Sequence, residues 1–270
     1  MANVTLLPTS DYFHVKVEQD KADPSNILYV DGQRDFFLNN GTTDYTLADN
    51  LDKPWGFCQI SCTEIILADS NNYCLQKIDR FTGNVSEFSG VCHYYKDSEL
   101  KYPTDVVIDK MNRSQLLVAD SKTVKSVELS TGNVSVFAQA MENVKTFWGL
   151  AQTENGDIYL VDYRAIYKAE YFSRSIVLVA GSPSVYGSTD GSLAQSTFRG
   201  IVDIEFITPH AVLVTDYENR LIRLVDFIAD KVTSIDVCAG VPSECIPLGL
   251  SITNATIYIG TNDILILPCK

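Results

Sequence analysis

Short hydrophobic runs that end in aspartate recur along the chain. Five such runs span residues 27–31, 65–69, 116–120, 158–162 and 212–216. Their terminal aspartates are separated by 38, 51, 42 and 54 residues, and a sixth, weaker run ends in glycine instead, at residue 260. Recurrence at about 40–50 residues is typical of one supersecondary unit repeated around an axis. The chain is therefore expected to be a repeat protein.

Each repeat predicts four β-strands. The second copy shows them most clearly: one strand opens at residues 54–57, the run 65–69 follows, and further strands cover 75–79 and 85–90. Turn residues separate these segments, and a Thr-Gly-Asn turn joins the last two, as expected of short antiparallel strands.

The two ends of the chain complement one another. The last copy provides only three strands, whereas residues 3–8 hold a strand-like segment that has no partner. Pairing the two would close a ring and remove two open sheet edges. We therefore predict an all-β fold, a six-bladed β-propeller of four-stranded antiparallel blades that forms a single domain over residues 1–270. The predicted blades cover approximately residues 11–50, 54–92, 102–140, 146–182, 198–240 and 246–270, the last completed by the strand at 3–8.

Two segments resemble a known repeat. Residues 69–76 and 216–223 both begin D-x-x-N, and residues 180–201 contain the Ala-Gly, Asp-Gly and Phe-Arg-Gly-Ile steps of a connection between blades. These features are similar to the core motif and the interblade connection of NHL repeats, in a divergent form of extracellular type. The resemblance implies a propeller fold, but it implies little about function, because function resides in sites placed on a fold.

The composition and net charge of the chain argue against some classes of binding partner. The chain has 46% hydrophobic residues and a net charge of −13. The acidity argues against nucleic acid or an anionic membrane surface as the partner. No run approaches the roughly 20 apolar residues of a membrane-spanning helix, so we expect no direct membrane insertion.

Glycosylation signals indicate a secretory protein. Six Asn-x-Ser/Thr sequons stand at Asn3, Asn40, Asn84, Asn112, Asn133 and Asn254. Two of them, Asn84 and Asn133, lie in equivalent predicted hairpin tips, where a glycan would point into water. The alternative is that Thr-Gly-Asn is simply favourable turn chemistry.

The spacing of the cysteines also agrees with a protein of the oxidising secretory pathway. Short-range pairs are expected at Cys58–Cys62, Cys74–Cys92 and Cys238–Cys245, which leaves Cys269 unpaired or bonded outside this chain. Zinc is the alternative, but the sequence has no C-x-x-C motif. Disulfides and sequons together favour an extracellular or cell-surface location. Because no signal peptide opens the sequence, we expect an excised ectodomain or a mature fragment.

Departures from the repeat mark a candidate binding face. The repeated aspartate is expected to be structural, because it recurs in five blades and suits tight turns. Both tryptophans precede a glycine at the start of a predicted innermost strand, near one mouth of the channel. Aromatic and arginine side chains on one face suit recognition of a protein or glycan; alternatively, the tryptophans plug the channel as core. The candidate ligand-binding residues are Trp55, Trp148, Tyr163, Arg164, Arg199 and Tyr217.

Catalysis is the runner-up hypothesis. A divergent metal-dependent hydrolase or an enzyme resembling amidating lyases would place its site in the channel. The histidines His14, His93 and His210 fall at unlike places in their blades, and only Asp105 and Asp203 suit a channel calcium site. We therefore expect no catalytic residue, metal or cofactor. The sequence favours a glycosylated extracellular binding module, within a larger secreted or surface protein, for a protein or glycan ligand.

Overall fold

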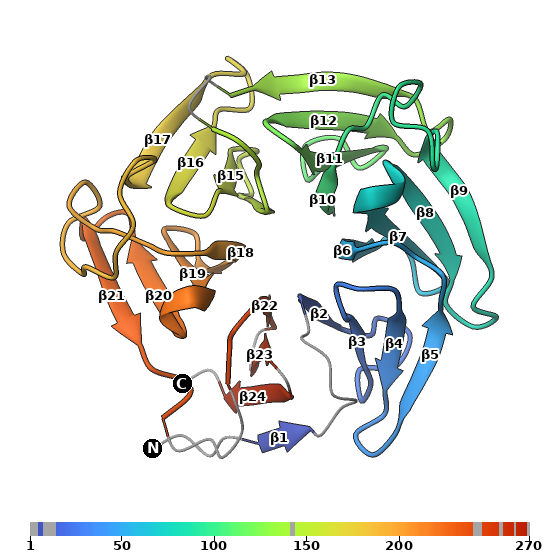
Figure 1. Cartoon of the computed structure of the whole chain (residues 1–270), viewed down its shortest axis with the longest axis horizontal. Helices are drawn as coiled ribbons and strands as arrows, with labels where there is room; N and C mark the ends of the chain where they lie inside the picture. The colour runs from blue at the N-terminus through green and yellow to red at the C-terminus, as the bar shows by residue number, and fades with distance from the viewer. Residues whose placement is uncertain are drawn as a thin grey trace.

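Six four-stranded antiparallel sheets stand around a common axis in the computed structural model (Figure 1). The structure describes residues 5–7, 15–140, 144–239, 245–253, 256–261 and 263–268. Asn3, His14, Asn254 and Cys269 lie outside the described residues. Within the described ranges, helical structure is limited to two single 3-10 turns, Ser70–Asn72 and Tyr217–Asn219. The six-bladed β-propeller predicted from the repeats is therefore confirmed.

Blades one to three take the first half of the ring. Blade one consists of β2 (Lys16–Gln19), β3 (Ile27–Val30), β4 (Phe36–Asn39) and β5 (Asp44–Ala48). Blade two consists of β6 (Pro54–Gln59), β7 (Glu64–Asp69), β8 (Cys74–Asp79) and β9 (Val85–Gly90). Blade three consists of β10 (Pro103–Ile108), β11 (Gln115–Asp120), β12 (Thr123–Glu128) and β13 (Val134–Gln139).

Blades four to six complete the ring. Blade four consists of β14 (Gly149–Gln152), β15 (Ile158–Val161), β16 (Ala165–Ala169) and β17 (Ile176–Gly181). Blade five consists of β18 (Ile201–Thr208), β19 (Ala211–Asp216), β20 (Leu221–Asp226) and β21 (Lys231–Ile235). Blade six combines β22 (Gly249–Ile252), β23 (Thr256–Gly260) and β24 (Ile264–Pro268) with the N-terminal β1 (Thr5–Leu7).

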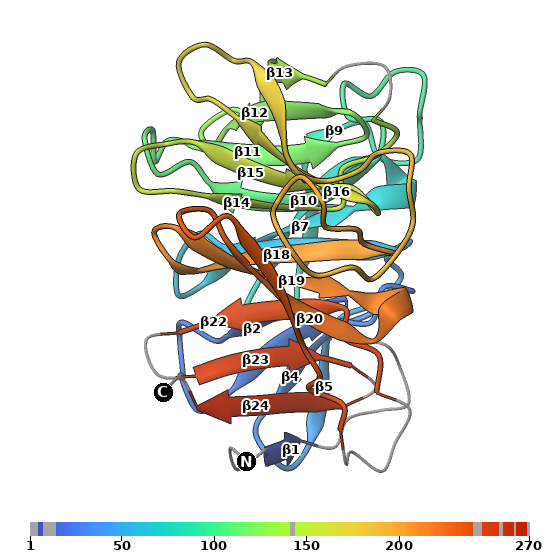
Figure 2. The same cartoon turned by 90° about the vertical axis from the view of Figure 1, so that its left-hand side faces the viewer.

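The N-terminal strand closes the ring as predicted. β1 pairs antiparallel with β24, with Thr5 opposite Ile266 and Leu7 opposite Ile264. Figures 1 and 2 show β1 on the outer side of β24, where it gives blade six its fourth strand. No helix in the described part of the chain has the length and apolar character needed to cross a membrane.

The core lies between blades. The hydrophobic runs form the second strand of each blade, which is packed between two neighbours and is therefore apolar on both faces. Ile65, Ile66 and Leu67 of β7 are at most 1% exposed, and they contact different clusters on the two sides of the sheet.

The repeated aspartates act as turn clamps. Asp31 Oδ1 accepts the backbone N–H groups of three following residues, at 2.8–3.1 Å. Asp120 Oδ1 accepts two N–H groups from the segment that enters its blade, at 2.6 and 2.8 Å. All five are buried. A carboxylate that satisfies several otherwise unpaired amides holds a turn in place, which supports the structural role expected for this residue.

Two of the three predicted disulfides form. Cys74–Cys92 and Cys238–Cys245 are bonded, whereas Cys58 and Cys62 are both free. The prediction of a Cys58–Cys62 bond is wrong, for a geometric reason. Cys58 lies opposite Ile66 in the ladder, and its side chain is buried between blades two and three. Cys62 lies in the exposed turn beyond that ladder, with its Sγ 3.8 Å from the Lys21 carbonyl.

Candidate functional site

The strand order gives the ring two chemically different faces. Each innermost strand begins where the second strand ends, as in the pairs Pro54–Asp69 and Gly149–Val161. We call this end of the channel the mouth face. The hairpins that join the first to the second strand and the third to the fourth strand lie on the opposite face. The four described sequon asparagines, all exposed, sit in those hairpins: Asn40, Asn84, Asn112 and Asn133.

Five aromatic side chains meet on the mouth face. We call them the mouth cluster: Trp55, Tyr102, Trp148, Tyr163 and Tyr217. Ring centroids lie 5.0 Å apart for Trp55–Trp148, 4.8 Å for Trp148–Tyr163 and 6.1 Å for Tyr163–Tyr217. Tyr102 meets Trp148 edge-on at 6.1 Å. Because separations of about 4.5–7 Å are the favourable range for aromatic pairs, the rings form one continuous surface across blades two to five.

The cluster both plugs the channel and faces solvent. All five residues are half-buried, and four of them pack against the buried core cluster that includes Val15, Val202 and Leu248. The two alternatives for the tryptophans are therefore compatible, since both residues pack against core side chains and remain partly exposed.

Glycines let the rings approach. A Cβ added at Gly149, directly after Trp148, would lie 2.9 Å from the Val202 carbonyl oxygen of the next blade. Gly200 has a φ of +100°, and a Cβ there would lie 2.5 Å from the Tyr217 ring. Only glycine combines that backbone conformation with such close packing, so Gly200 fixes where Tyr217 stands.

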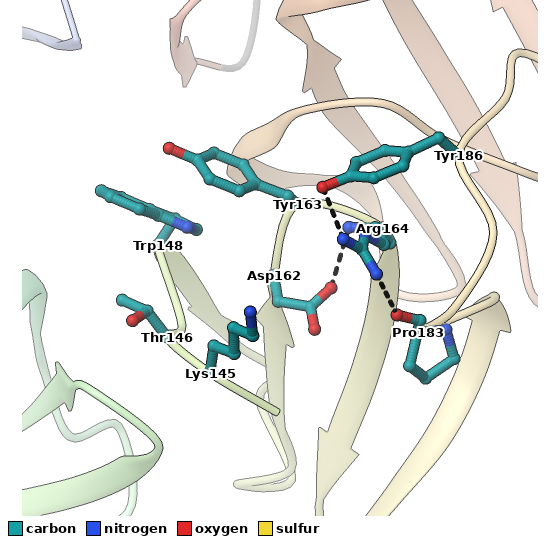
Figure 3. A pocket seen from close by; sticks show the side chains of 8 residues that line it. All are labelled: Lys145, Thr146, Trp148, Asp162, Tyr163, Arg164, Pro183 and Tyr186. Atoms are coloured by element: carbon teal, nitrogen blue, oxygen red, sulfur yellow. Dashed lines mark hydrogen bonds between the residues drawn. The ribbon is translucent and has the colours of Figure 1, made fainter. Parts of the chain in front are cut away.

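Two cavities flank Tyr163. The blade-four pocket, about 330 Å³, lies between Trp148, Tyr163, Arg164 and Tyr186, with Lys145 and Asp162 on its wall (Figure 3). The channel-mouth pocket, about 280 Å³, is lined by Trp55, Tyr163, Tyr217 and Gln33 among others. Since Tyr163 lines both, the two pockets adjoin across one ring.

Arg164 is held in place at the blade-four pocket. Its Nη1 donates to the Pro183 carbonyl at 2.7 Å and its Nη2 to the Tyr186 hydroxyl at 2.5 Å. Its guanidinium carbon lies 3.8 Å from the Tyr186 ring centroid. A stacked, hydrogen-bonded guanidinium presents a fixed positive group to a ligand.

Arg199 takes a different position. Its side chain is 57% exposed and pairs with Glu218, Nε to Oε2, at 2.6 Å. It lines neither cavity beside Tyr163. Of the six predicted residues, four thus belong to the mouth cluster, Arg164 lines the adjoining pocket, and Arg199 stands at the rim.

Three residues of this site lack a sequence signal. Tyr102 directly precedes β10, whereas Lys145 and Tyr186 belong to connections between strands, where the repeat pattern gives no expectation. Tyr186 could have been suspected only from its place in the long connection after β17.

Below the cluster, the channel holds a buried cation among carboxylates. Lys16 Nζ lies 3.1 Å from Asp203 Oδ1, 3.6 Å from Glu205 Oε1 and 3.7 Å from Asp105 Oδ2. Burial disfavours the charged amine, but these carboxylates hold the pKa of Lys16 well above its usual value. Burial raises the pKa of Asp203 and of Glu205 to about 7, although the Glu205 side chain is 33% exposed.

The channel carboxylates are already engaged. Asp105 Oδ2 accepts the Leu150 N–H at 3.0 Å, and Asp203 Oδ2 accepts the Leu250 N–H at 2.7 Å. Each aspartate thus ties its blade to the next, and Lys16 lies within 4 Å of both carboxylates. Among the described residues, no group of three His, Cys, Asp or Glu side chains is placed to hold a metal ion.

The described histidines do not converge. His93 Nδ1 lies 2.7 Å from Asn72 Oδ1 in blade two, whereas His210 lies in the exposed hairpin between β18 and β19 on the opposite face.

A larger cavity, about 650 Å³, lies on this opposite face. Its lysines are paired with acidic side chains, Lys168 with Asp157 at 2.6 Å and Lys110 with Glu154 at 2.7 Å. The mouth face therefore carries the candidate site.

Comparison with known proteins shows the fold. No family model and no curated protein matches the chain. Among solved structures, the chain is similar to an auxiliary nutrient binding protein from Bacteroides thetaiotaomicron VPI-5482, with a TM-score of 0.79 and 13% identity over 98% of this chain and 75% of that one.

Two enzymes are also among the structural neighbours. A gluconolactonase from Xanthomonas campestris has a TM-score of 0.72 and 13% identity over 99% of this chain and 89% of that one. Virginiamycin B lyase from Staphylococcus aureus has a TM-score of 0.66 and 13% identity over 98% of this chain and 83% of that one. At such identity the likeness extends to the fold alone: the chain is a six-bladed β-propeller whose structural neighbours include binding proteins and enzymes.

Proposed function

We propose that this chain is an extracellular, non-catalytic binding module, built as a divergent NHL-type propeller, that recognises its ligand on the mouth face. The observation that carries the proposal is the continuous row of half-buried rings from Trp55 through Trp148 and Tyr163 to Tyr217. Large, rigid aromatic side chains bury much area at little cost in side-chain entropy, and they dominate the binding energy of interfaces.

The surroundings of the cluster support this reading. Arg164 is pre-positioned by two hydrogen bonds and a ring contact, so little conformational freedom is lost when it binds. The described sequon asparagines lie on the opposite face. Glycans attached there would leave the mouth face free.

The cysteines support the proposed extracellular compartment. Two disulfides form in the described part of the chain, and structural disulfides are typical of oxidising environments. Together with the exposed sequons, they favour a secreted or cell-surface protein.

An enzyme with its site in the channel is the second candidate, since a lactonase and a lyase share the fold. Against it stands the engagement of Asp105 and Asp203, whose oxygens face Lys16 and backbone amides. A metal ion or substrate that used Asp105 or Asp203 would first have to displace Lys16 or a backbone amide from the carboxylate.

The proposal is tested by screening the protein against arrays of glycans and extracellular proteins. Replacing Trp148 by alanine should weaken any specific ligand by about 2 kcal/mol, because a central ring of the cluster is lost. Phe172→Ala is the matched control, since Phe172 is 83% exposed and lies in the hairpin between β16 and β17 on the opposite face.

The outcomes separate the candidates. Equal binding by wild type and Trp148→Ala would place the site elsewhere. Recovery of the ligand with an altered mass would favour catalysis instead. If Trp148→Ala lowers the melting temperature sharply, Arg164→Ala provides the same test without removing a side chain that packs against the core.

A further inference from the structure

The blade-four pocket is positively charged although the chain is acidic. The chain carries a net charge of −13, yet both Lys145 and Arg164 line this pocket. In Figure 3 the Lys145 side chain rises toward Asp162. Lys145 is exposed, and the described part of the chain gives it no ion-pair partner.

The one carboxylate on the wall is occupied. Asp162 Oδ1 accepts the N–H groups of Arg164 and Ala165 at 2.8 and 2.9 Å, and its Oδ2 accepts the Tyr167 hydroxyl at 3.0 Å. Because Asp162 serves its own turn, the pocket offers two cationic groups to a ligand. A planar guanidinium beside an amine suits a carboxylate or sulfate group.

The rest of the wall is aromatic. Trp148 and Tyr163 are stacked with an interplanar angle of 24°, and the Tyr186 ring is 51% exposed. Such rings pack well against a ligand that has a flat apolar side and a polar edge. A sugar ring meets this description, since its C–H bonds form one face and its hydroxyl groups form the rim.

Several backbone groups around the pocket are already paired. The Trp148 N–H donates to the Val161 carbonyl at 2.8 Å, the Gly200 N–H to the Tyr163 carbonyl at 2.7 Å, and the Pro183 carbonyl accepts Arg164. An extended peptide draws much of its affinity from main-chain hydrogen bonds with an open strand edge. These pairings favour recognition by side chains, and therefore a glycan over a peptide.

The site has room for more than one ring. The blade-four and channel-mouth pockets, about 330 and 280 Å³, adjoin across Tyr163. Each is at or below the lower end of the range for small-molecule sites. A chain of linked units, one in each pocket, fits this arrangement better than a single large ligand.

We propose that the ligand of the mouth face is an acidic glycan. One sugar ring lies against Trp148 and Tyr163 with its carboxylate or sulfate on Arg164 and Lys145, and the saccharide continues over Tyr163 into the channel-mouth pocket. This inference rests on the proposed binding function and names its ligand class.

The test compares four probes that differ either in charge or in scaffold. They are a linear tetrasaccharide of galacturonic acid, the same tetrasaccharide with its carboxylates methyl-esterified, a sulfated tetrasaccharide of neutral rings, and tetraglutamate. Dissociation constants are measured by calorimetry. The galacturonate should bind about tenfold more tightly than its ester. Its affinity should fall between about 50 and about 500 mM NaCl, as expected of contacts between exposed charges.

The variant Lys145→Met sharpens the test. It should weaken the galacturonate about fivefold and leave the ester unchanged, because only the acidic probe uses the amine. Lys231→Met is the control, since it removes the same charge from an exposed site on the outer strand of blade five. Whichever of carboxylated and sulfated saccharide binds more tightly identifies the source of the anionic group.

Three results would overturn the inference. Equal affinity for acid and ester would exclude the anionic contact while leaving the binding module intact. Tighter binding of tetraglutamate would assign the face to acidic peptides. Absence of binding by every anionic saccharide would refute the ligand class, and the array screen with Trp148→Ala would still decide the proposed function independently.

Discussion

At the scale of single residues, the buried polar groups of blade five show how a repeat motif is maintained. Asp216 and Arg223 stand seven residues apart, and Asp69 and Gln76 occupy the same positions in blade two. Arg223 is fully buried and donates to Asp216 and Asp190, both at 2.8 Å. Its remaining bonds go to carbonyl groups of the connection between blades four and five, so one side chain ties the two blades together.

Removing the Arg223 guanidinium should therefore be costly. Arg223→Met would leave the Asp216 carboxylate buried without its cation, and we expect the free energy of unfolding to fall by about 3–5 kcal/mol. Arg223→Gln, which copies the residue at the equivalent place in blade two, should cost clearly less. Urea denaturation of the two variants measures the difference. Equal losses would mean that volume, rather than hydrogen bonding to Asp216, is what Arg223 contributes.

At the scale of elements, closure of the ring depends on a three-residue strand. β1 covers the outer edge of β24, and no other described strand pairs with that edge. An uncovered edge exposes unpaired backbone groups and invites association with other chains. Blade six therefore depends on residues at opposite ends of the chain.

Deleting residues 1–7 tests this dependence. We expect a loss of about 2–4 kcal/mol in the free energy of unfolding, from lost strand pairing and exposure of apolar surface on β24, together with concentration-dependent association. Deleting residues 1–3 is the matched control, because it spares β1. Chemical denaturation and sedimentation velocity provide the readouts. A shortened chain as stable and as monomeric as the control would show that closure by β1 is not needed for stability.

At the scale of the whole molecule, the channel concentrates charge from three alternate blades. Lys16 comes from blade one, Asp105 from blade three, and Asp203 and Glu205 from blade five. Burial also raises the pKa of Glu18, which shares the channel side of β2 with Lys16. The carboxylates outnumber the single amine, and this imbalance makes stability depend on pH.

The direction of that dependence follows from linkage. Asp203 and Glu205, each with a pKa of about 7 in the folded protein, hold protons there that the unfolded chain releases near pH 4. The folded state thus binds more protons between about pH 4 and pH 7, and stability contributed by this pair falls as pH rises through that window.

Glu205→Gln should flatten the profile. Between about pH 5.5 and pH 8, wild type should lose about 1 kcal/mol more stability than the variant, after allowance for the solvent exposure of the Glu205 side chain. Urea midpoints across the pH range measure this difference. Parallel profiles for the two proteins would show that Glu205 does not titrate in this window.

The sequence by itself determined the architecture. Repeat spacing and strand patterning are local properties, so they predicted six four-stranded blades. Because the last repeat has only three strands, it was the one place where the N-terminal strand could pair. Two disulfides were predictable because each closes a short connection. The meeting of Trp55 and Trp148 at one mouth of the channel was predictable as well, since the two occupy equivalent places and propeller geometry brings equivalent places together.

The tertiary structure alone decided how side chains far apart in sequence combine. Lys16 meets Asp203 across 187 residues, and no local pattern encodes that contact. Lys145 and Tyr186 reach the blade-four pocket from connections that carry no repeat signal. The Cys58–Cys62 prediction was wrong because a bond requires side chains that face each other, and strand geometry buries Cys58 between blades while Cys62 stays in the turn. Periodicity specifies which elements form, but only the closed ring specifies which side chains share a site.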